Sequence, residues 1–151
     1  MSETHRPSAG ASSDFVPPWR LRHHHVQTIY PSLPLRRAGV ERRASVLRQA
    51  SREAIVDCGD GVRLLALVAT QADAGRPPTD RLAVLLHGWE GSANSLYLLS
   101  LGQSLFDAGY DVARLNLRDH GESHHLNAGI FHSCRIAEVV GAVRDLQRQH
   151  P

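Results

Sequence analysis

Residues 82–92 read LAVLLHGWEGS, a short apolar run followed directly by a polar turn. The run Leu82–Leu86 is apolar at every position, whereas a strand with one face in water alternates apolar and polar residues. Continuous apolar strands are typical of parallel sheets that are covered on both faces, as in α/β proteins. We therefore predict a buried parallel strand over Leu82–Leu86 and a sharp turn over His87–Ser92.

The residues after this turn predict a helix and a second strand. Apolar residues at 96, 98, 99, 101, 105 and 106 recur at helical spacing, and Gly109 stands where a helix commonly ends. Asp111–Leu117 is then predicted as a strand and Arg118–Ser123 as a second polar turn. A strand, a helix and a strand in this order form a parallel pair through a right-handed crossover. A last helix is marked by apolar residues at Ile136, Val139, Val140, Val143 and Leu146.

The amino-acid sequence divides the whole chain into three parts. Residues 1–14 are predicted as a disordered tail, residues 15–44 as an N-terminal extension, and residues 45–151 as a partial α/β domain. In the extension, prolines exclude one long helix, and we expect only a short helix around His25–Tyr30.

Two kinds of segment precede the apolar strand. The basic stretch Arg36–Arg52 is interpreted as a solvated face, within which Val46–Gln49 is predicted as a strand. Arg52–Val56 and Val62–Thr70 predict a β-hairpin, because Gly-Asp and Asp-Gly steps between apolar runs are typical of hairpin turns. Residues 71–81 are predicted as a loop.

Composition restricts the class of protein. The chain has 151 residues, with 17 Lys and Arg against 15 Asp and Glu, a formal net charge of +2 that does not suggest a nucleic-acid surface. A mean hydropathy of −0.28 and the absence of a long apolar run predict a globular protein with no transmembrane segment. Cys58 and Cys134 stand far apart, so we expect no disulfide framework and a cytoplasmic location.

The two polar turns are the candidate functional residues. In open α/β sheets the reactive site lies beyond the carboxyl ends of the parallel strands, where both turns are predicted to lie. The backbone N–H of Trp89, directly after His87 and Gly88, is the natural donor to an oxyanion, a role that matters by roughly 10²–10³ in rate. The alternative is an ordinary strand-to-helix turn with no reacting partner.

These turns, taken with an upstream element, carry a resemblance to a known family. His87-Gly88-Trp89-Glu90-Gly91-Ser92, Arg118-Asp119-His120-Gly121-Glu122-Ser123 and His25-Val26-Gln27-Thr28-Ile29 together resemble the α/β-hydrolase superfamily, and within it the YheT-like esterases and lipases. The resemblance implies strand order 1-2-4-3, one oxyanion-hole donor at Trp89, and structural roles for the other turn residues, His87 included. It also implies a small-molecule ester or lipid substrate and no cofactor.

The same resemblance implies residues that the sequence does not contain. The nucleophile of this fold is a serine in Gly-x-Ser-x-Gly, followed along the chain by an acid and a histidine, and no such motif occurs here. Gly121-Glu122-Ser123 has no closing glycine, and Gly102-Gln103-Ser104 falls within a predicted helix. We therefore expect the N-terminal half of a hydrolase, truncated before its nucleophile and inactive alone.

Two substitute nucleophiles and a metal site are the alternatives within the chain. Ser123 with His124 or His125 is one, although adjacent residues rarely reach serine–base geometry. Cys134 near His132 is another, although a lone cysteine is more often simply packed. The histidine runs at 23–25 and 124–125 are poorly spaced for a tetrahedral metal site, so no metal is expected.

Two hypotheses follow from these patterns. One is a serine carboxylic-ester hydrolase without its catalytic half. The other is a non-enzymatic chain that binds a complementing partner or associates with itself through Leu82–Leu86. The second hypothesis rests on the strand order, which leaves this apolar strand at an open edge of the sheet.

Overall fold

A computed structural model describes residues 16–30 and 34–150, which form two compact units divided between Arg36 and Arg37. The predicted tail, residues 1–14, lies outside the described residues. In the first unit a 3₁₀ turn, η1 (Trp19–Leu21), precedes helix α1 (His24–Ile29), where the short helix was expected. The Gln27 side chain joins them by donating to the Leu21 carbonyl at 2.7 Å.

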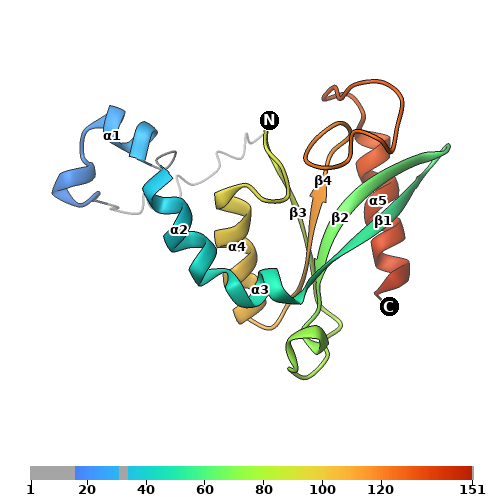
Figure 1. Cartoon of the computed structure of the whole chain (residues 1–151), viewed down its shortest axis with the longest axis horizontal. Coiled ribbons are helices and arrows are strands. Elements are labelled where there is room, and N and C mark those ends of the chain that lie inside the picture. Colours follow the sequence, from blue (N-terminus) through green and yellow to red (C-terminus); the bar gives the residue numbers. More distant parts are fainter. Residues whose placement is uncertain (1–15, 31–33, 151) are drawn as a thin grey trace, which may run out of the picture. The chain divides into compact units, whose positions relative to one another are not determined.

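The second unit is a four-stranded mixed sheet with helices on both faces (Figure 1). The strands are β1 (Ser51–Gly59), β2 (Val62–Ala69), β3 (Leu82–Leu86) and β4 (Asp111–Asn116). The helices are α2 (Pro34–Arg43), α3 (Ser45–Ala50), α4 (Leu96–Asp107) and α5 (Ile136–Gln149), and a 3₁₀ turn, η3 (Ala72–Ala74), lies in the loop after β2. The strand order is β1-β2-β4-β3, with β3 parallel to β4 and the other pairs antiparallel. This confirms the α/β class and the predicted order.

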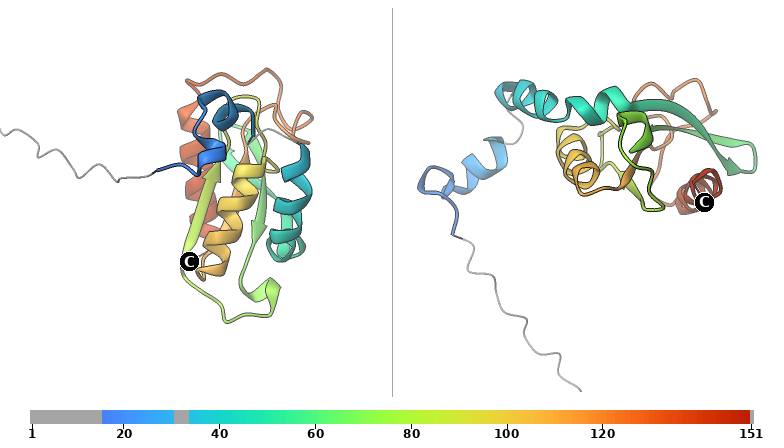
Figure 2. Two further views of the ribbon diagram at one scale, coloured as in Figure 1. Left: turned by 90° about the vertical axis from the view of Figure 1, so that its left-hand side faces the viewer. Right: turned by 90° about the horizontal axis from the view of Figure 1, so that it is seen from below.

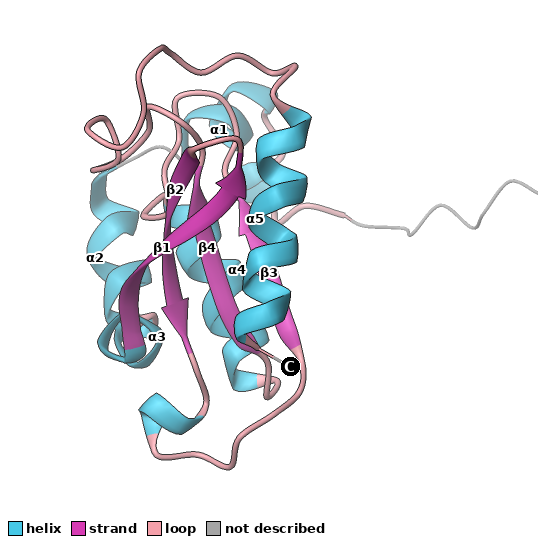
Figure 3. Cartoon of the chain, turned by 90° about the vertical axis from the view of Figure 1, so that its right-hand side faces the viewer, coloured by secondary structure: helices cyan, strands magenta, loops and turns pink. Residues whose placement is uncertain are grey.

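The two faces of the sheet have separate cores because successive side chains of a strand point to opposite sides. Val112 packs with α3 and α4, whereas its neighbour Ala113 packs with Ala142 and Leu146 of α5. Figures 2 and 3 show α5 alone on its face, with α3 and α4 on the other. β4, which lies between two strands, is buried at every position.

Two turns form as their sequences predict. Asp60 and Gly61 connect β1 to β2 with φ of 52° and 74°, the two positive values that define a type I′ hairpin turn. At the end of α4, Gly109 has φ of 85°, and the Tyr110 N–H donates to the Leu105 carbonyl at 3.1 Å. This arrangement is a Schellman cap, so Gly109 ends the helix as expected.

Two predictions about buried segments were wrong. Val46–Gln49 lies in helix α3 and not in a strand, because Val40, Ala44 and Leu47 form a buried stripe with helical spacing across α2 and α3. The arginines of this stretch are largely exposed, but the segment is more than a solvated face. β3 is also not covered throughout, since only Leu85 is buried and Leu86 is 44% exposed. The reason is that β3 lies at the edge of the described sheet.

Helix α5 lies very close to strand β1. A Cβ atom placed on Gly141 would stand 2.0 Å from the Cys58 carbonyl oxygen, so only glycine fits there. The Asp145 carboxylate, on the same side of α5, accepts a hydrogen bond from the Asp57 N–H at 3.0 Å. These two contacts fix the position of α5 along β1 and determine which face of the helix packs against the strand.

Candidate functional site

The structure brings the two polar turns together at one edge of the sheet. His87 follows β3, and its Nε2 accepts a hydrogen bond from the backbone N–H of Leu117, which follows β4, at 3.1 Å. The imidazole rings of His87 and His120 are 4.7 Å apart between centroids. Because β3 and β4 are parallel, the two turns leave the sheet side by side, as the sequence predicts.

His87 connects the turns as a neutral ring. Since its Nε2 accepts from Leu117, the ring proton belongs on Nδ1, which lies 2.8 Å from the Gly88 carbonyl oxygen and donates to it. Burial lowers the pKa of His87, the Gly88 hydrogen bond opposes this effect, and the nearby His120 lowers the pKa further. Both ring nitrogens are engaged with backbone groups, so His87 is positioned as a structural residue.

The first turn holds Trp89 in a defined backbone geometry. The Gly91 N–H donates to the Gly88 carbonyl at 3.0 Å, which closes a β-turn with Trp89 and Glu90 at its centre. Glu90 has φ of 53°, so the turn is of type II, although a glutamate is strained in that position. The Gly88 N–H donates to the Tyr97 hydroxyl at 2.5 Å, so the turn is fastened to α4.

At this turn Trp89 has an exposed side chain and a backbone N–H that no described residue accepts. Its side chain is 80% exposed and approaches Phe131 edge-on, with 6.4 Å between ring centroids. Within the described part of the chain its backbone N–H has no hydrogen-bond acceptor. The turn therefore presents one unused donor beyond the carboxyl end of a parallel strand.

Two polar side chains of β4 hold the loop that follows this turn. Asn116 accepts from the Ala93 N–H at 2.7 Å, and the Arg114 guanidinium donates to the Ala93 carbonyl at 3.0 Å. Arg114 is 1% exposed, and burial, with a smaller effect of the nearby Arg48, lowers its pKa to about 10. Neither Arg114 nor Asn116 was identified from the sequence, where each is only a polar residue within an apolar strand.

The second turn is packed against the same asparagine. Gly121 has φ of 59°, and a Cβ at this position would stand 2.8 Å from Asn116 Oδ1. Asp119 also has a positive φ, 60°, which is uncommon for a residue with a side chain. The glycine is therefore required both by its backbone conformation and by the space that Asn116 occupies.

Arg118 anchors the second turn to α5. Its guanidinium donates to Glu138 Oε1 at 2.7 Å and to the Ala128 carbonyl at 2.7 Å, and Arg135 also donates to Glu138 at 2.9 Å. Burial acts to raise the pKa of Glu138, but hydrogen bonds from the two arginines hold it below its ordinary value. Arg118 belongs to a turn that the sequence pattern marks, whereas its partner Glu138 lies 20 residues away in the chain and no local pattern indicates it.

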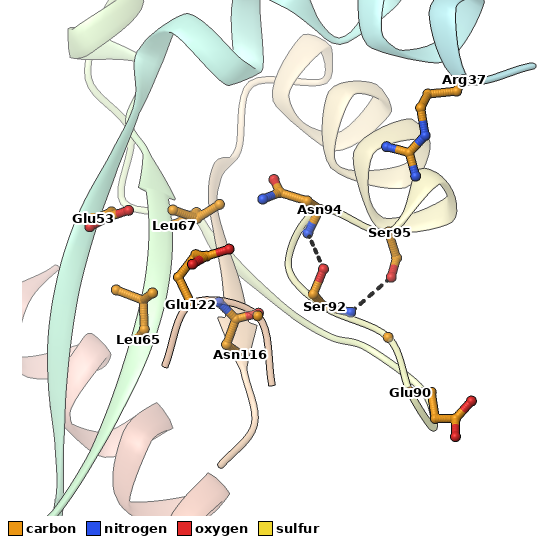
Figure 4. A pocket seen from close by; sticks show the side chains of 12 residues that line it. Arg37, Glu53, Leu65, Leu67, Glu90, Ser92, Asn94, Ser95, Asn116 and Glu122 are labelled. Carbon is orange, nitrogen blue, oxygen red and sulfur yellow. Dashed lines mark hydrogen bonds between the residues drawn. The ribbon is translucent and has the colours of Figure 1, made fainter. Parts of the chain in front are cut away.

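A cavity of about 520 Å³ lies beside the turns (Figure 4). Leu65 and Leu67 of β2 line the cavity on one side, and Ser92, Asn94 and Ser95, which lie between β3 and α4, line it on the other. The remaining lining residues are Arg37, Glu53, Glu90, Gly91, Asn116, Gly121 and Glu122. Four of the twelve lining residues are charged and only two are aliphatic, so the cavity is mainly polar. Trp89 does not line this cavity.

The substitute nucleophiles are not paired with a base. Ser123 is 1% exposed, and its hydroxyl donates to the His120 carbonyl at 2.7 Å. His124 contacts Asp119 instead, with 2.6 Å between Nδ1 and Oδ1. Cys134 is exposed and free, as Cys58 is free, and among residues 16–30 and 34–150 it has no hydrogen bond to a histidine. The structure therefore assembles no serine–histidine or cysteine–histidine pair from the described residues.

Among residues 16–30 and 34–150, no group of three or more His, Cys, Asp and Glu side chains is placed to hold a metal ion. No helix in this part of the chain has the length and apolar character needed to cross a membrane.

Fold and site together define an α/β protein with an open mixed sheet and two polar turns joined at the carboxyl ends of its parallel strands. Comparisons of the chain with family models, with curated proteins and with solved structures found no match.

Proposed function

We propose that the second unit is the N-terminal portion of an α/β-hydrolase fold and that its reaction class is serine carboxylic-ester hydrolysis. The observation that supports this most directly is the Trp89 N–H, which has no acceptor among the described residues and lies just beyond β3. A preorganised backbone donor in this position is what an oxyanion requires. The sheet order and the resemblance of both turns to this superfamily support the same proposal.

In this proposal the chain supplies one of the groups that the reaction requires, the donor to the oxyanion. A serine hydroxyl attacks the acyl carbonyl, its proton passes to a histidine, and the carbonyl oxygen becomes an oxyanion. Trp89 donates its N–H to that oxyanion, while His87, Tyr97 and Asn116 keep the turn rigid. The serine, the acid and the histidine come from outside these 151 residues, since the sequence has no Gly-x-Ser-x-Gly. The substrate is a small ester or a lipid ester.

The geometry of the turn allows a backbone test. Trp89 is the second residue of a type II turn, a position that proline favours, so Trp89→Pro removes the N–H and preserves the turn. Trp89→Phe is the matched control, because it changes the side chain and keeps the N–H. Trp89→Pro is expected to lower kcat by about 10²-fold or more, and Trp89→Phe by much less.

The experiment requires the catalytic residues, so it begins with the DNA beyond codon 151. Translation in all frames is expected to give a Gly-x-Ser-x-Gly segment followed by an acid and a histidine, and the two variants are then compared in the extended protein with p-nitrophenyl butyrate. The 151-residue chain alone is expected to show no turnover. Absence of the segment, equal rates for the two variants, or turnover by the short chain that Ser123→Ala or Cys134→Ala abolishes, would each contradict the proposal.

The open edge of the sheet favours a second candidate function. Among the described strands, β3 pairs only with β4, and its sequence has no charged residue or proline to protect the other edge. We therefore keep the alternative that the chain acts without catalysis, by binding a partner along β3.

A further inference from the structure

We propose that the cavity beside the two polar turns is a binding site for a small hydroxyl-bearing amine, such as an amino sugar. This inference goes beyond ester hydrolysis, because Trp89, the donor to the oxyanion, does not line the cavity. The site holds its ligand through unpaired carboxylates and through hydrogen-bond donors that no described residue uses.

The cavity lies over the part of the sheet that is away from β3. Its lining includes Glu53 of β1 and Leu65 and Leu67 of β2, and every lining residue belongs to the second unit, which begins at Arg37. The strand order is β1-β2-β4-β3, so β4 separates β3 from the strands that line the cavity. A sheet that continues beyond β3, as the proposed function requires, therefore adds its strands away from this cavity.

The cavity has an excess of unpaired negative charge. Glu53, Glu90 and Glu122 line it from β1 and from the two polar turns, and none of them forms an ion pair with a described residue. Among the described lining residues only Arg37 is positively charged, and it is already paired with Glu41 at 3.1 Å. Carboxylates that share a cavity repel one another, so a positively charged ligand is favoured there.

The spacing of the carboxylates does not suit a single metal ion. Within residues 16–30 and 34–150, the glutamates of the cavity form no group that could hold one. A ligand that contacts carboxylates on separate elements must instead carry its polar groups apart from one another, on a small organic frame. The side chains of Leu65 and Leu67 offer apolar contact to the carbon atoms of such a frame.

A buried asparagine supplies a hydrogen-bond donor that faces the cavity. Asn116 is 4% exposed and lines the cavity (Figure 4). Its Oδ1 accepts from the Ala93 N–H at 2.7 Å, which fixes the amide plane, and no described residue accepts from its Nδ2. In the described part of the chain, the unpartnered side-chain atoms that are sealed from solvent are Nε of Arg114 and Nε of Arg135, so Asn116 Nδ2 opens into the cavity. An ammonium group cannot accept this N–H, whereas a hydroxyl oxygen can.

Two serine hydroxyls of the loop between β3 and α4 add further donors. Ser95 Oγ accepts from the Ser92 N–H at 2.9 Å, and Ser92 Oγ accepts from the Asn94 N–H at 3.2 Å (Figure 4). These bonds hold both oxygens in place, and neither hydroxyl donates to a described residue. The loop therefore presents oriented O–H groups to a ligand that carries acceptors.

An amino group and several hydroxyls on one small frame satisfy both kinds of lining residue. The ammonium group binds the glutamates, while the hydroxyls accept from Asn116 and the serines and donate to the remaining carboxylate oxygens. The cavity volume of about 520 Å³ lies within the usual range for small-molecule sites. A neutral sugar lacks the charge that the glutamates favour, and a simple amine lacks the acceptors that Asn116 requires.

NMR titration of the ¹⁵N-labelled 151-residue chain tests the proposal. Near pH 6, where an aliphatic amine carries its proton, glucosamine should shift the amide signals of Gly91, Ser92 and Gly121 with a Kd on the order of 1 mM. N-acetylglucosamine, which is neutral, and cyclohexylamine, which has no hydroxyl, should each bind about tenfold more weakly.

Two variants that remove a charge test the location of the site. Glu53→Gln and Glu122→Gln, both at exposed positions, should each weaken glucosamine binding about fivefold. Asp60→Asn is the matched control, because it removes the same charge in the β1–β2 turn, outside the cavity, and should leave the Kd unchanged. Circular dichroism of each variant verifies that it is folded.

Four results would overturn the proposal. Glucosamine that shifts no lining signal at about ten times the expected Kd would show that the cavity binds no such ligand. Equal binding of N-acetylglucosamine would show that charge is not recognised, and equal binding of cyclohexylamine would reduce the site to an acidic patch without hydroxyl recognition. A Kd that neither glutamine variant changes would place the binding elsewhere on the chain.

Discussion

Replacement of Gly141 by alanine should destabilise the fold, although alanine is the better helix former. In an exposed helix interior, Gly→Ala gains about 1 kcal/mol. At Gly141 the new Cβ would stand 2.0 Å from the Cys58 carbonyl oxygen, whereas such contacts need at least 3.0 Å. Both atoms belong to the backbone or are fixed to it, so no side-chain rotation relieves the contact. Helix α5 must move away from β1 by about 1 Å.

That movement has a calculable cost. A gap of 0.5–1 Å forfeits roughly a quarter to a half of the dispersion energy of the atoms it separates. Leu146 and Ala142 are fully buried beneath α5, and Leu146 alone contributes about 2 kcal/mol by burial. Half of the burial energy of these two residues, together with the weakened Asp145 hydrogen bond to the Asp57 N–H, amounts to about 2 kcal/mol. After the propensity gain, Gly141→Ala should be less stable by about 1 kcal/mol.

Urea denaturation followed by circular dichroism measures this difference. Gly39→Ala is the matched control, because Gly39 also lies within a helix, but the nearest atom to its Cβ position is Arg43 Nη1 at 3.9 Å. That variant should gain about 0.5–1 kcal/mol. If Gly141→Ala is as stable as the parent chain, or gains stability as Gly39→Ala does, then α5 does not contact β1 in the way described.

Three other predictions concern the turns. Glu138→Gln should reduce stability at pH 7 by about 3 kcal/mol, because it removes the charged partner of the buried Arg118. Since folding lowers the pKa of Glu138, the parent chain should lose this stabilisation as pH falls below about 4.5, and denaturation should show a smaller difference between the two proteins at pH 3.5 than at pH 7. Burial keeps His87 neutral, so the midpoint of its NMR titration should lie below pH 6.5. Because the unfolded chain binds that proton at a higher pH than the folded chain, the free energy of unfolding should decline as pH falls below 6.5. A midpoint at or above pH 6.5 would contradict a buried, neutral His87. Glu90→Gly should raise the free energy of unfolding by about 0.5–1 kcal/mol, since glycine adopts the φ of 53° without strain, and a lower urea midpoint would show that the Glu90 side chain makes a contact that offsets its strain.

Much of the local structure could be predicted because it depends on residues close in sequence. A type I′ turn needs two positive φ angles, which Asp60-Gly61 readily adopts, and Gly109 can end a helix wherever it occurs. The continuous apolar pattern of Leu82–Leu86 likewise predicted its strand and the parallel pairing. The positions of both polar turns followed, because parallel strands end at the same edge.

Other features depended on distant residues. Val46–Gln49 was predicted as a strand because a short apolar run has no clear period, and its helix is stabilised by contacts of Leu47 with α4, including the Gln103 hydrogen bond. The clamp of Arg114 and Asn116 on Ala93 joins residues more than 20 positions apart, and no local pattern specifies it.

By itself, the sequence determined the secondary structure around the two polar turns and placed Trp89 between two glycines, because turn and strand preferences act over a few residues. The tertiary structure alone decided which groups of those turns are used and which are free. It engages both nitrogens of His87 and the hydroxyl of Ser123 while giving the Trp89 N–H no acceptor among the described residues. It also left β3 with an open edge beside the aliphatic side chains of α4 and α5. Hydrogen-bond satisfaction and burial depend on packing between elements, which residue order alone does not specify.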